Sequence, residues 1–199
     1  MRIIISALIM FTIYSQGSAQ GFQGKLVLGA NAAQVDGDEY AGYNKAGLAL
    51  GAAAAYNFSK KIYLQGEILY SQKGARAVDP DNYIYFKWRL NYIDIPLIFN
   101  YHFTEKLSTQ IGLMPSVFLN SKTDLGHGFF NANEGFDKVN VSYTGGIEYA
   151  ITKGIAFNAR HSYSLGPINT GGSNIHPRSF YNNVITVSLR ITLNPDRED

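Results

Sequence analysis

Alternation of apolar and polar residues runs through nearly the whole chain after residue 20, and it constrains the fold more than any other feature. In the segment 62–73, for example, Leu64 and Ile68 lie on one face, whereas Gln65 and Glu67 lie on the other. A period of two residues is typical of β-strands with one apolar face. The pattern predicts eight strands, at about residues 24–33, 44–58, 62–73, 83–101, 107–120, 138–149, 155–165 and 181–193.

The connections between these strands alternate in length without exception. The short connections are 59–61, 102–106 and 152–154, and the long ones are about 34–43, 74–82, 122–136 and 166–180. In an up-and-down arrangement, all short connections then lie at one end and all long connections at the other. Outer-membrane barrels are organised in this way, with short periplasmic turns and long extracellular loops.

The composition of the two strand faces indicates which face points outward. One face consists almost entirely of Leu, Ile, Val, Phe and Tyr, although only 16% of all residues are charged. The other face gathers charges among Gly, Ser and Asn: Lys25, Glu67, Lys73, Arg89, Asp94, Glu148, Arg160 and Arg190. A soluble barrel directs its apolar face inward, whereas a transmembrane barrel directs it to lipid. We therefore predict an all-β fold, an eight-stranded antiparallel up-and-down transmembrane β-barrel, with a soluble periplasmic barrel as the alternative.

Aromatic residues gather near the predicted strand ends, as in the interfacial girdles of membrane proteins. Those near the short turns are Phe58, Phe99, Tyr101, Tyr149 and Phe157, and those near the long loops are Tyr83, Tyr85, Phe180 and Tyr181. We expect both groups on the outer wall.

The N-terminus has the features of a secretory signal peptide. Arg2 precedes an uncharged apolar run over residues 3–14, and Gly17 and Ala19 occupy the two small positions of a cleavage site. We predict a signal peptide over residues 1–19, a barrel domain over 20–193 and a short charged periplasmic tail over 194–199. The apolar run is too short to span a bilayer as a helix. Together with the barrel pattern, these features predict a protein of the cell outer membrane that is exported by a cleaved N-terminal signal peptide.

Charged residues of the polar face are expected to meet inside the barrel, because eight strands enclose an interior about wide enough for side chains to fill. The predicted lumen charge network comprises Glu67, Arg89, Asp94, Glu148, Arg160 and Arg190. Inward-facing glycines would make room for these side chains: Gly29, Gly47, Gly51, Gly112 and Gly146. A plugged lumen is the main interpretation, and a gated conduit or proton path is the alternative.

The segment 83–101 contains a break in its alternation. Trp88 and Leu90 lie on an apolar face that ends at Tyr92, and a second apolar face starts at Ile93. Two adjacent apolar residues on one face indicate one extra residue, so we predict a β-bulge at Tyr92 and Ile93. In this interpretation Arg89 faces the lumen and Trp88 faces lipid.

Several segments together resemble the PorT-like outer-membrane β-barrel proteins of Bacteroidetes. The most specific segment is Leu90-Asn91-Tyr92-Ile93-Asp94-Ile95-Pro96-Leu97. The resemblance also rests on Gly29-Ala30-Asn31, Asp36-Gly37-Asp38, Lys45-Ala46-Gly47, Gly51 and Leu69-Tyr70-Ser71-Gln72-Lys73-Gly74. The similarity covers essentially the whole mature chain. It implies an eight-stranded outer-membrane barrel of a Gram-negative cell. The founding member of the family takes part in type IX protein secretion, so a secretion accessory is an alternative function.

The chain closes its last strand at Leu193 and adds residues 194–199, whereas such barrels usually end on an aromatic residue that the insertion machinery reads.

The sequence does not predict an enzyme. The tract 159–164 superficially resembles the His-and-Ser strand of outer-membrane lipid A deacylases, but Tyr163 stands two residues after His161, where the nucleophilic Ser would be needed. Ser162 and Ser164 point the other way. His102, His127 and His176 show no metal-ligand spacing. We therefore expect no catalytic residue, no metal and no cofactor.

The remaining expectations concern partners. A net charge of +2 without a run of Lys or Arg gives no footprint for nucleic acid. We expect a monomer in contact with outer-membrane lipid, with a possible protein partner at loops 34–43, 122–136 and 166–180. Phe129, Phe130 and Phe136 could form a docking surface or fold back over the barrel mouth.

Overall fold

The computed structural model describes residues 22–38, 42–79, 84–132, 135–169 and 178–193. The predicted signal peptide (1–19) and charged tail (194–199) lie outside these residues. No helix within the described residues is long and apolar enough to cross a bilayer.

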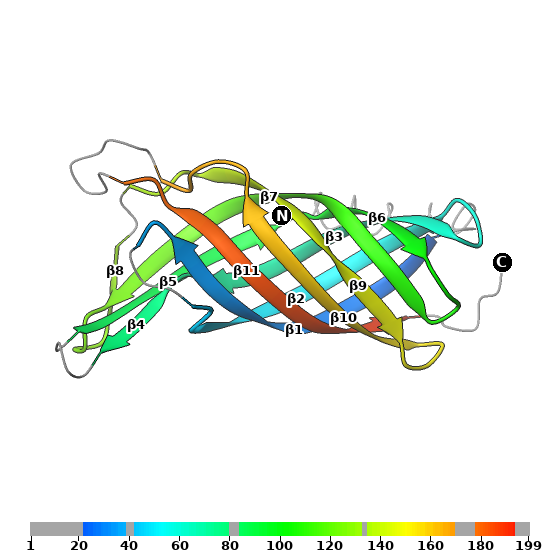
Figure 1. The fold of residues 1–199 in the computed structure, drawn as a ribbon, viewed down its shortest axis with the longest axis horizontal. Helices are drawn as coiled ribbons and strands as arrows, with labels where there is room; N and C mark the ends of the chain where they lie inside the picture. Colours follow the sequence, from blue (N-terminus) through cyan, green and yellow to red (C-terminus); the bar gives the residue numbers. More distant parts are fainter. Residues whose placement is uncertain (1–21, 39–41, 80–83, 133–134, 170–177, 194–199) are drawn as a thin grey trace, which may run out of the picture.

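The strands form a closed antiparallel barrel, and they cross its long axis obliquely (Figure 1). Its wall consists of β1 (Phe22–Asp36), β2 (Lys45–Asn57), β3 (Ile62–Lys73), β5 (Ile84–Asp94) continued by β6 (Leu97–His102), β7 (Leu107–Asp124), β9 (Val139–Ala150), β10 (Ile155–Ser164) and β11 (Tyr181–Thr192). Each strand pairs with its neighbours in chain order, and pairing of β1 with β11 closes the ring. The predicted eight-stranded up-and-down barrel is confirmed.

Strands β5 and β6 act as one wall strand with an interruption at Ile95 and Pro96. The register with β3 and with β7 is the same on both sides of this interruption. Pro96 has no N–H to donate, but its carbonyl accepts the N–H of Glu67 at 2.9 Å, and the Ile95 N–H donates to Pro115 at 2.8 Å. The wall therefore stays continuous.

The ends of the barrel differ, as the connection lengths predict. Short turns join β2 to β3, β6 to β7 and β9 to β10 at one end, and the long connections lie at the other (Figure 1). Two short strands that the sequence did not predict lie within long connections: β4 (Arg76–Asp79) pairs with β5, and β8 (Phe129–Asn131) pairs with β7. They extend the wall into a sheet of order β4-β5-β7-β8, which we call the long-loop sheet.

The strand register shows an irregularity next to Tyr92, near the predicted bulge at Tyr92 and Ile93, but it places the extra residue on the neighbouring strand. The register of β5 against β3 runs unbroken through both residues. The irregularity lies in the β5–β7 pairing, where Asn91 pairs with Asn120 but Tyr92 pairs with Phe118. The extra residue is therefore Leu119 on β7.

The break in the alternation of β5 has another cause. Trp88, Leu90 and Tyr92 are buried inside the barrel, and Asp94 lies on the same inward face. In chain order, the inward side chains change from apolar at Trp88, Leu90 and Tyr92 to polar at Asp94. The same alternate residues of β5 face the lumen throughout. Arg89 consequently points outward, away from the lumen in which the sequence interpretation placed it.

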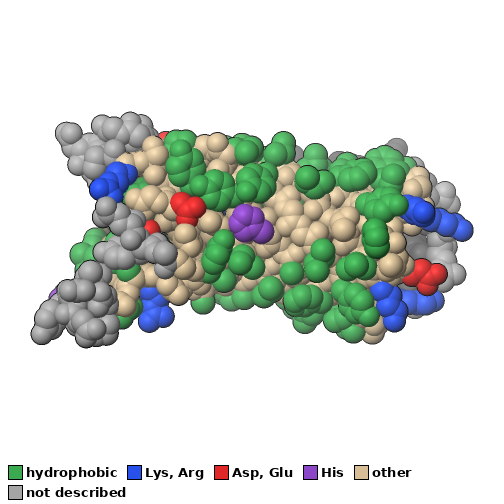
Figure 2. Space-filling view, in the orientation of Figure 1, with side chains coloured by type: hydrophobic (Ala, Val, Ile, Leu, Met, Phe, Trp, Pro, Cys, Tyr) green, Lys and Arg blue, Asp and Glu red, His purple; other side chains and the backbone are tan. Residues whose placement is uncertain are grey.

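The outer wall is apolar, and Figure 2 shows hydrophobic side chains covering much of one side. The aromatic residues expected near the short turns are all at least 38% exposed: Phe58, Phe99, Tyr101, Tyr149 and Phe157. Near the long loops, Tyr85 is also exposed, whereas Phe180 is buried in the interior and does not belong to a girdle. Tyr83 lies outside the described residues.

Candidate functional site

The interior next to the short turns is filled by an ion-pair layer centred on Glu67. Both carboxylate oxygens of Glu67 accept hydrogen bonds from Arg160, at 2.8 and 2.9 Å, and Arg190 donates to one of them at 2.6 Å. Glu67 comes from β3, whereas the two arginines come from β10 and β11, so these pairs cross the lumen. All three side chains are buried. A bidentate arginine–carboxylate pair of this kind is both strong and geometrically specific.

A second carboxylate extends the layer toward the short turns. Glu148 lies 3.2 Å from the Lys25 ammonium and 3.2 Å from Nε of Arg190. Gln110 joins the two carboxylate centres, because its carbonyl accepts from Nε of Arg160 at 2.8 Å and its amide donates to Glu148 at 3.4 Å. The layer thus links six strands around the ring. We define the ion-pair layer as Lys25, Glu67, Gln110, Glu148, Arg160 and Arg190.

Asp94 belongs to a separate buried pair nearer the middle of the barrel. Lys73 contacts Asp94 at 2.8 Å, donates to Ser116 at 3.3 Å, and lies 4.8 Å from the centre of the Tyr92 ring. Tyr92 belongs to the aromatic group described below, so this lysine contacts both a carboxylate and an aromatic face.

Of the six residues predicted for the charge network, the structure therefore brings Glu67, Glu148, Arg160 and Arg190 together. Asp94 has its own partner, and Arg89 lies outside the lumen. The sequence placed Lys25 and Lys73 on the polar face but did not assign them to the network, although their shared face was the signal that could have done so.

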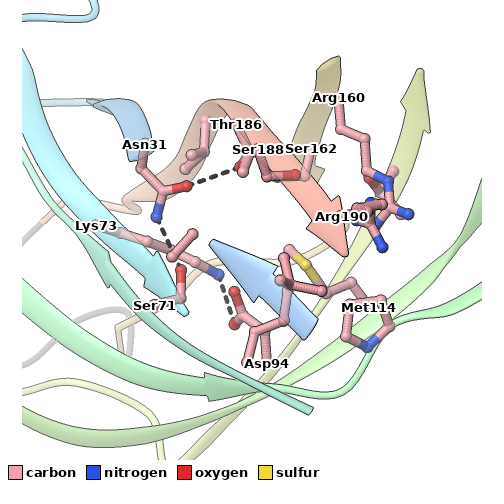
Figure 3. A pocket seen from close by; sticks show the side chains of 16 residues that line it. Asn31, Ser71, Lys73, Asp94, Met114, Arg160, Ser162, Thr186, Ser188 and Arg190 are labelled. Atoms are coloured by element: carbon pink, nitrogen blue, oxygen red, sulfur yellow. Dashed lines mark hydrogen bonds and ion pairs between the residues drawn. The ribbon is translucent and has the colours of Figure 1, made fainter. Parts of the chain in front are cut away.

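A small cavity lies between the ion-pair layer and the middle pair, and Figure 3 shows Lys73, Asp94, Arg160 and Arg190 around it. Its volume is about 20 Å³, which corresponds to roughly one water molecule. Asn31 crosses this level as well, donating to Ser71 at 3.0 Å and accepting from Thr186 at 2.8 Å.

A group of apolar side chains fills much of the interior next to the long loops, beside buried polar side chains such as Lys45, Asn140 and Asn182. We call this group the aromatic layer: Val35, Ala75, Trp88, Leu90, Tyr92, Phe118, Ile168 and Phe180, with Phe86 and Phe136 packed against it. Trp88 makes edge contacts with Phe136 and Phe180 at ring-centre distances of 5.6 and 5.2 Å. Such pairs contribute beyond their buried area.

The sequence left two roles open for the phenylalanines between β7 and β9, a docking surface or packing over the barrel mouth. Phe136 folds back and packs against Trp88 and Phe118. Phe129 and Phe130 do not belong to the aromatic layer, and they are 37% and 51% exposed.

The inward glycines have a second role besides the space predicted for the lumen side chains. A Cβ at Gly51 would meet the Ile68 carbonyl oxygen at 2.0 Å, and one at Gly146 would meet the Ala159 carbonyl oxygen at 2.1 Å. The conflict is with the backbone of the neighbouring strand. These glycines therefore allow close strand approach in a curved wall, in addition to any space they leave in the lumen.

The outer wall gives no arrangement of a nucleophile with a base around His161. The His161 ring lies 2.9 Å from the side-chain oxygen of Asn183, whereas Ser162 and Ser164 are buried on the lumen side. Among the described residues, no three His, Asp or Glu side chains gather in a metal-binding arrangement.

Comparison with known proteins identifies the family. Residues 14–169 match the family model described as outer membrane protein beta-barrel domain. The chain belongs to this family. Membership places the barrel in an outer membrane, with the apolar wall against lipid. No curated protein is significantly similar in sequence.

Two solved structures share the fold. Neisserial surface protein A is 14% identical, with a TM-score of 0.54, and the match covers 86% of this chain and 96% of that one. Ail, the attachment invasion locus protein of Yersinia pestis, is 10% identical, with a TM-score of 0.51, over 87% of this chain and 99% of that one. At such low identity, the similarity concerns the fold alone.

Proposed function

We propose that this outer-membrane barrel is a closed membrane anchor that presents its long-loop sheet and loops to a partner at the cell surface. The observation that carries the proposal is the filling of the lumen from both ends. The ion-pair layer crosses the lumen near the short turns, the aromatic layer fills much of the other half, and the cavity between them measures about 20 Å³. An anchor of this kind acts through what it displays outside the membrane.

Conductance in planar bilayers tests the closed lumen. We expect little or no current from protein whose insertion is verified by heat-modifiable gel mobility. Large, steady single-channel currents would refute the closed anchor and favour a conduit.

Orientation can be tested with introduced thiols, because the chain contains no cysteine. A membrane-impermeant maleimide should label the Phe130→Cys variant on intact cells. The Lys60→Cys variant, in the short turn after β2, is the matched control and should react only after the outer membrane is opened. Labelling of both variants on intact cells, or of the turn alone, would contradict the proposed display of the loops.

The resemblance to PorT-like proteins supports a second function, that of an accessory in protein secretion through contact with partner subunits. Deletion of the gene separates the two functions, because only a secretion role predicts loss of exported proteins from the secreted fraction. An unchanged secreted fraction would leave the anchor as the sole proposal.

Export by a cleaved signal peptide completes the proposal. N-terminal sequencing of protein from the outer membrane should begin at Gln20. A mature chain that still begins at Met1 would exclude cleavage.

A further inference from the structure

The outward face of the long-loop sheet carries four cations in neighbouring positions. Arg76 on β4 pairs directly with Lys87 on β5, and Arg89 on β5 pairs directly with Lys122 on β7. Residues directly opposite each other in a sheet share a face, and Lys87 and Arg89 are two residues apart, so all four lie on the same face. We call this group the cationic face.

Two cross-strand pairs of the cationic face, Arg76 with Lys87 and Arg89 with Lys122, are like-charged, whereas Lys87 also lies directly opposite Asp124 on β7. Directly opposed like charges destabilise a sheet, and among the described residues none of these four side chains has an ion-pair partner. The one carboxylate on the same face, Asp124, accepts hydrogen bonds from the N–H groups of Gly126 and Gly128 at 2.9 and 3.0 Å. Among the described residues, the face therefore carries four cations against one carboxylate, and its positive charge is only partly compensated.

An aromatic ring holds two of the cations in place. The Arg89 guanidinium lies 4.3 Å, and the Lys87 ammonium 5.3 Å, from the centre of the Phe129 ring on β8. Nε of Arg89 is shielded from solvent and has no hydrogen-bond partner among the described residues. Cation–π contacts restrict these side chains and leave their remaining donors available to an anion.

The position of the cationic face along the wall decides which anion it can meet. Arg89 lies on the same face of the same strand as Ile93, and this face continues to the lipid-exposed Leu97 and the girdle residue Tyr101. From Tyr101 to Asn91 the strand climbs roughly 25 Å, at about 3.3 Å per residue and a tilt of about 40°. This climb equals the height of the apolar band of such barrels. Arg89 and its neighbours therefore lie at the level of the barrel axis where the lipid headgroups begin.

We propose that the cationic face binds the phosphate groups of an anionic lipid headgroup in the outer leaflet. Arg presents paired donors that match phosphate geometry, and Lys adds a compact charge. Clustered basic residues beside a membrane surface attract anionic lipid headgroups. This inference concerns the membrane contact of the barrel and holds whether or not the loops bind a protein partner.

The test measures glycolipid that stays bound to the protein. Protein is inserted into phosphatidylcholine vesicles that contain either phosphorylated lipid A or the same lipid A without its phosphates. It is then extracted in mild detergent, and bound lipid A is counted by native mass spectrometry. The test variant is Lys87→Gln/Arg89→Gln/Lys122→Gln.

The matched control removes the same charge at the other end of the barrel. Lys60→Gln/Lys61→Gln/Lys106→Gln changes three exposed lysines in the short turns. We expect the wild type and this control to retain phosphorylated lipid A, and the test variant to retain at least about tenfold less. Retention of the dephosphorylated lipid should be low for all three proteins. Equal retention by all three proteins, or retention that does not depend on the phosphates, would overturn the proposal.

Two further measurements keep the proposal testable. If the test variant does not fold by heat-modifiable mobility, retention by the wild type is measured at rising salt, since 1 M salt shortens the screening length to about 3 Å. Retention should fall, and salt-independent retention would overturn the proposal.

The second measurement compares binding of a soluble sulfated polysaccharide by the wild type and the test variant. If the test variant loses only this binding and still retains lipid A, the cationic face does not bind lipid, and the proposal is overturned.

Discussion

The two halves of the lumen are filled by opposite kinds of chemistry. Next to the short turns, two carboxylates and their cationic partners cross the barrel, whereas next to the long loops aromatic rings pack around Trp88. Charges in a low-dielectric interior are tolerated only as a complete set, because any unpaired member keeps its desolvation cost. Apolar contacts are lost in proportion to the atoms removed. The comparison teaches that one barrel can be closed by an interdependent network at one end and by separable contacts at the other.

Removal of the central carboxylate should have the largest effect. Glu67→Ala leaves Arg160 and Arg190 without their main partner, so we expect the free energy of unfolding to fall by about 3–5 kcal/mol. Urea titration followed by heat-modifiable mobility measures this change. Glu105→Ala, in an exposed short turn, is the control and should stay within about 0.5 kcal/mol of wild type. Equal effects of both substitutions would contradict the role of the ion-pair layer.

Loss of the tryptophan ring should have the next largest effect. Trp88→Ala removes the ring that contacts Phe86, Phe136 and Phe180, and we expect a loss of about 3 kcal/mol. Trp88→Phe keeps much of the contact and should lose less. Because the halves are separate, the Trp88→Ala and Glu67→Ala effects should add in the double variant. Strong non-additivity would show that the two layers form one unit.

Replacement of both members of the middle pair should cost little. Asp94→Leu alone leaves the buried Lys73 ammonium without its ion-pair partner, whereas Lys73→Met/Asp94→Leu removes both charges together. Apolar replacement of a whole buried ion pair is often neutral, so we expect the double variant to lie within about 1 kcal/mol of wild type and the single variant to be clearly less stable. The same urea titration serves here, and a double variant less stable than the single one would contradict this expectation.

The smallest expected effect is the quenching of Trp88 fluorescence by brominated lipid. Trp88 is the chain's only tryptophan and faces the interior, so bromine in the acyl chains should quench it weakly. The variant Trp88→Phe/Leu97→Trp moves the indole to the lipid-facing side of the same wall strand and should be quenched strongly. Strong quenching of the wild type would instead indicate that Trp88 faces lipid, as the sequence pattern predicted.

The sequence by itself determined the wall. The period of two residues, the alternation of connection lengths and the charges on one face together predicted eight strands, their order and the outward direction of the apolar face. Glu67, Glu148, Arg160 and Arg190 could be placed inside because a charge opposite an apolar, lipid-facing row has no other low-cost position.

Only the tertiary structure decided how the interior is filled along the barrel axis. The sequence treated the run from Trp88 to Tyr92 as lipid-facing because period alone cannot distinguish a lipid contact from an aromatic interior, both of which favour apolar side chains. Phe118 and Val35, apolar residues on the polar face, carried the missing signal, but their proximity to Trp88 depends on strand register and on the extra residue Leu119. The outward turn of Arg89, and with it the cationic face beside Phe129, follows from that register and from the pairing of two short strands within long loops.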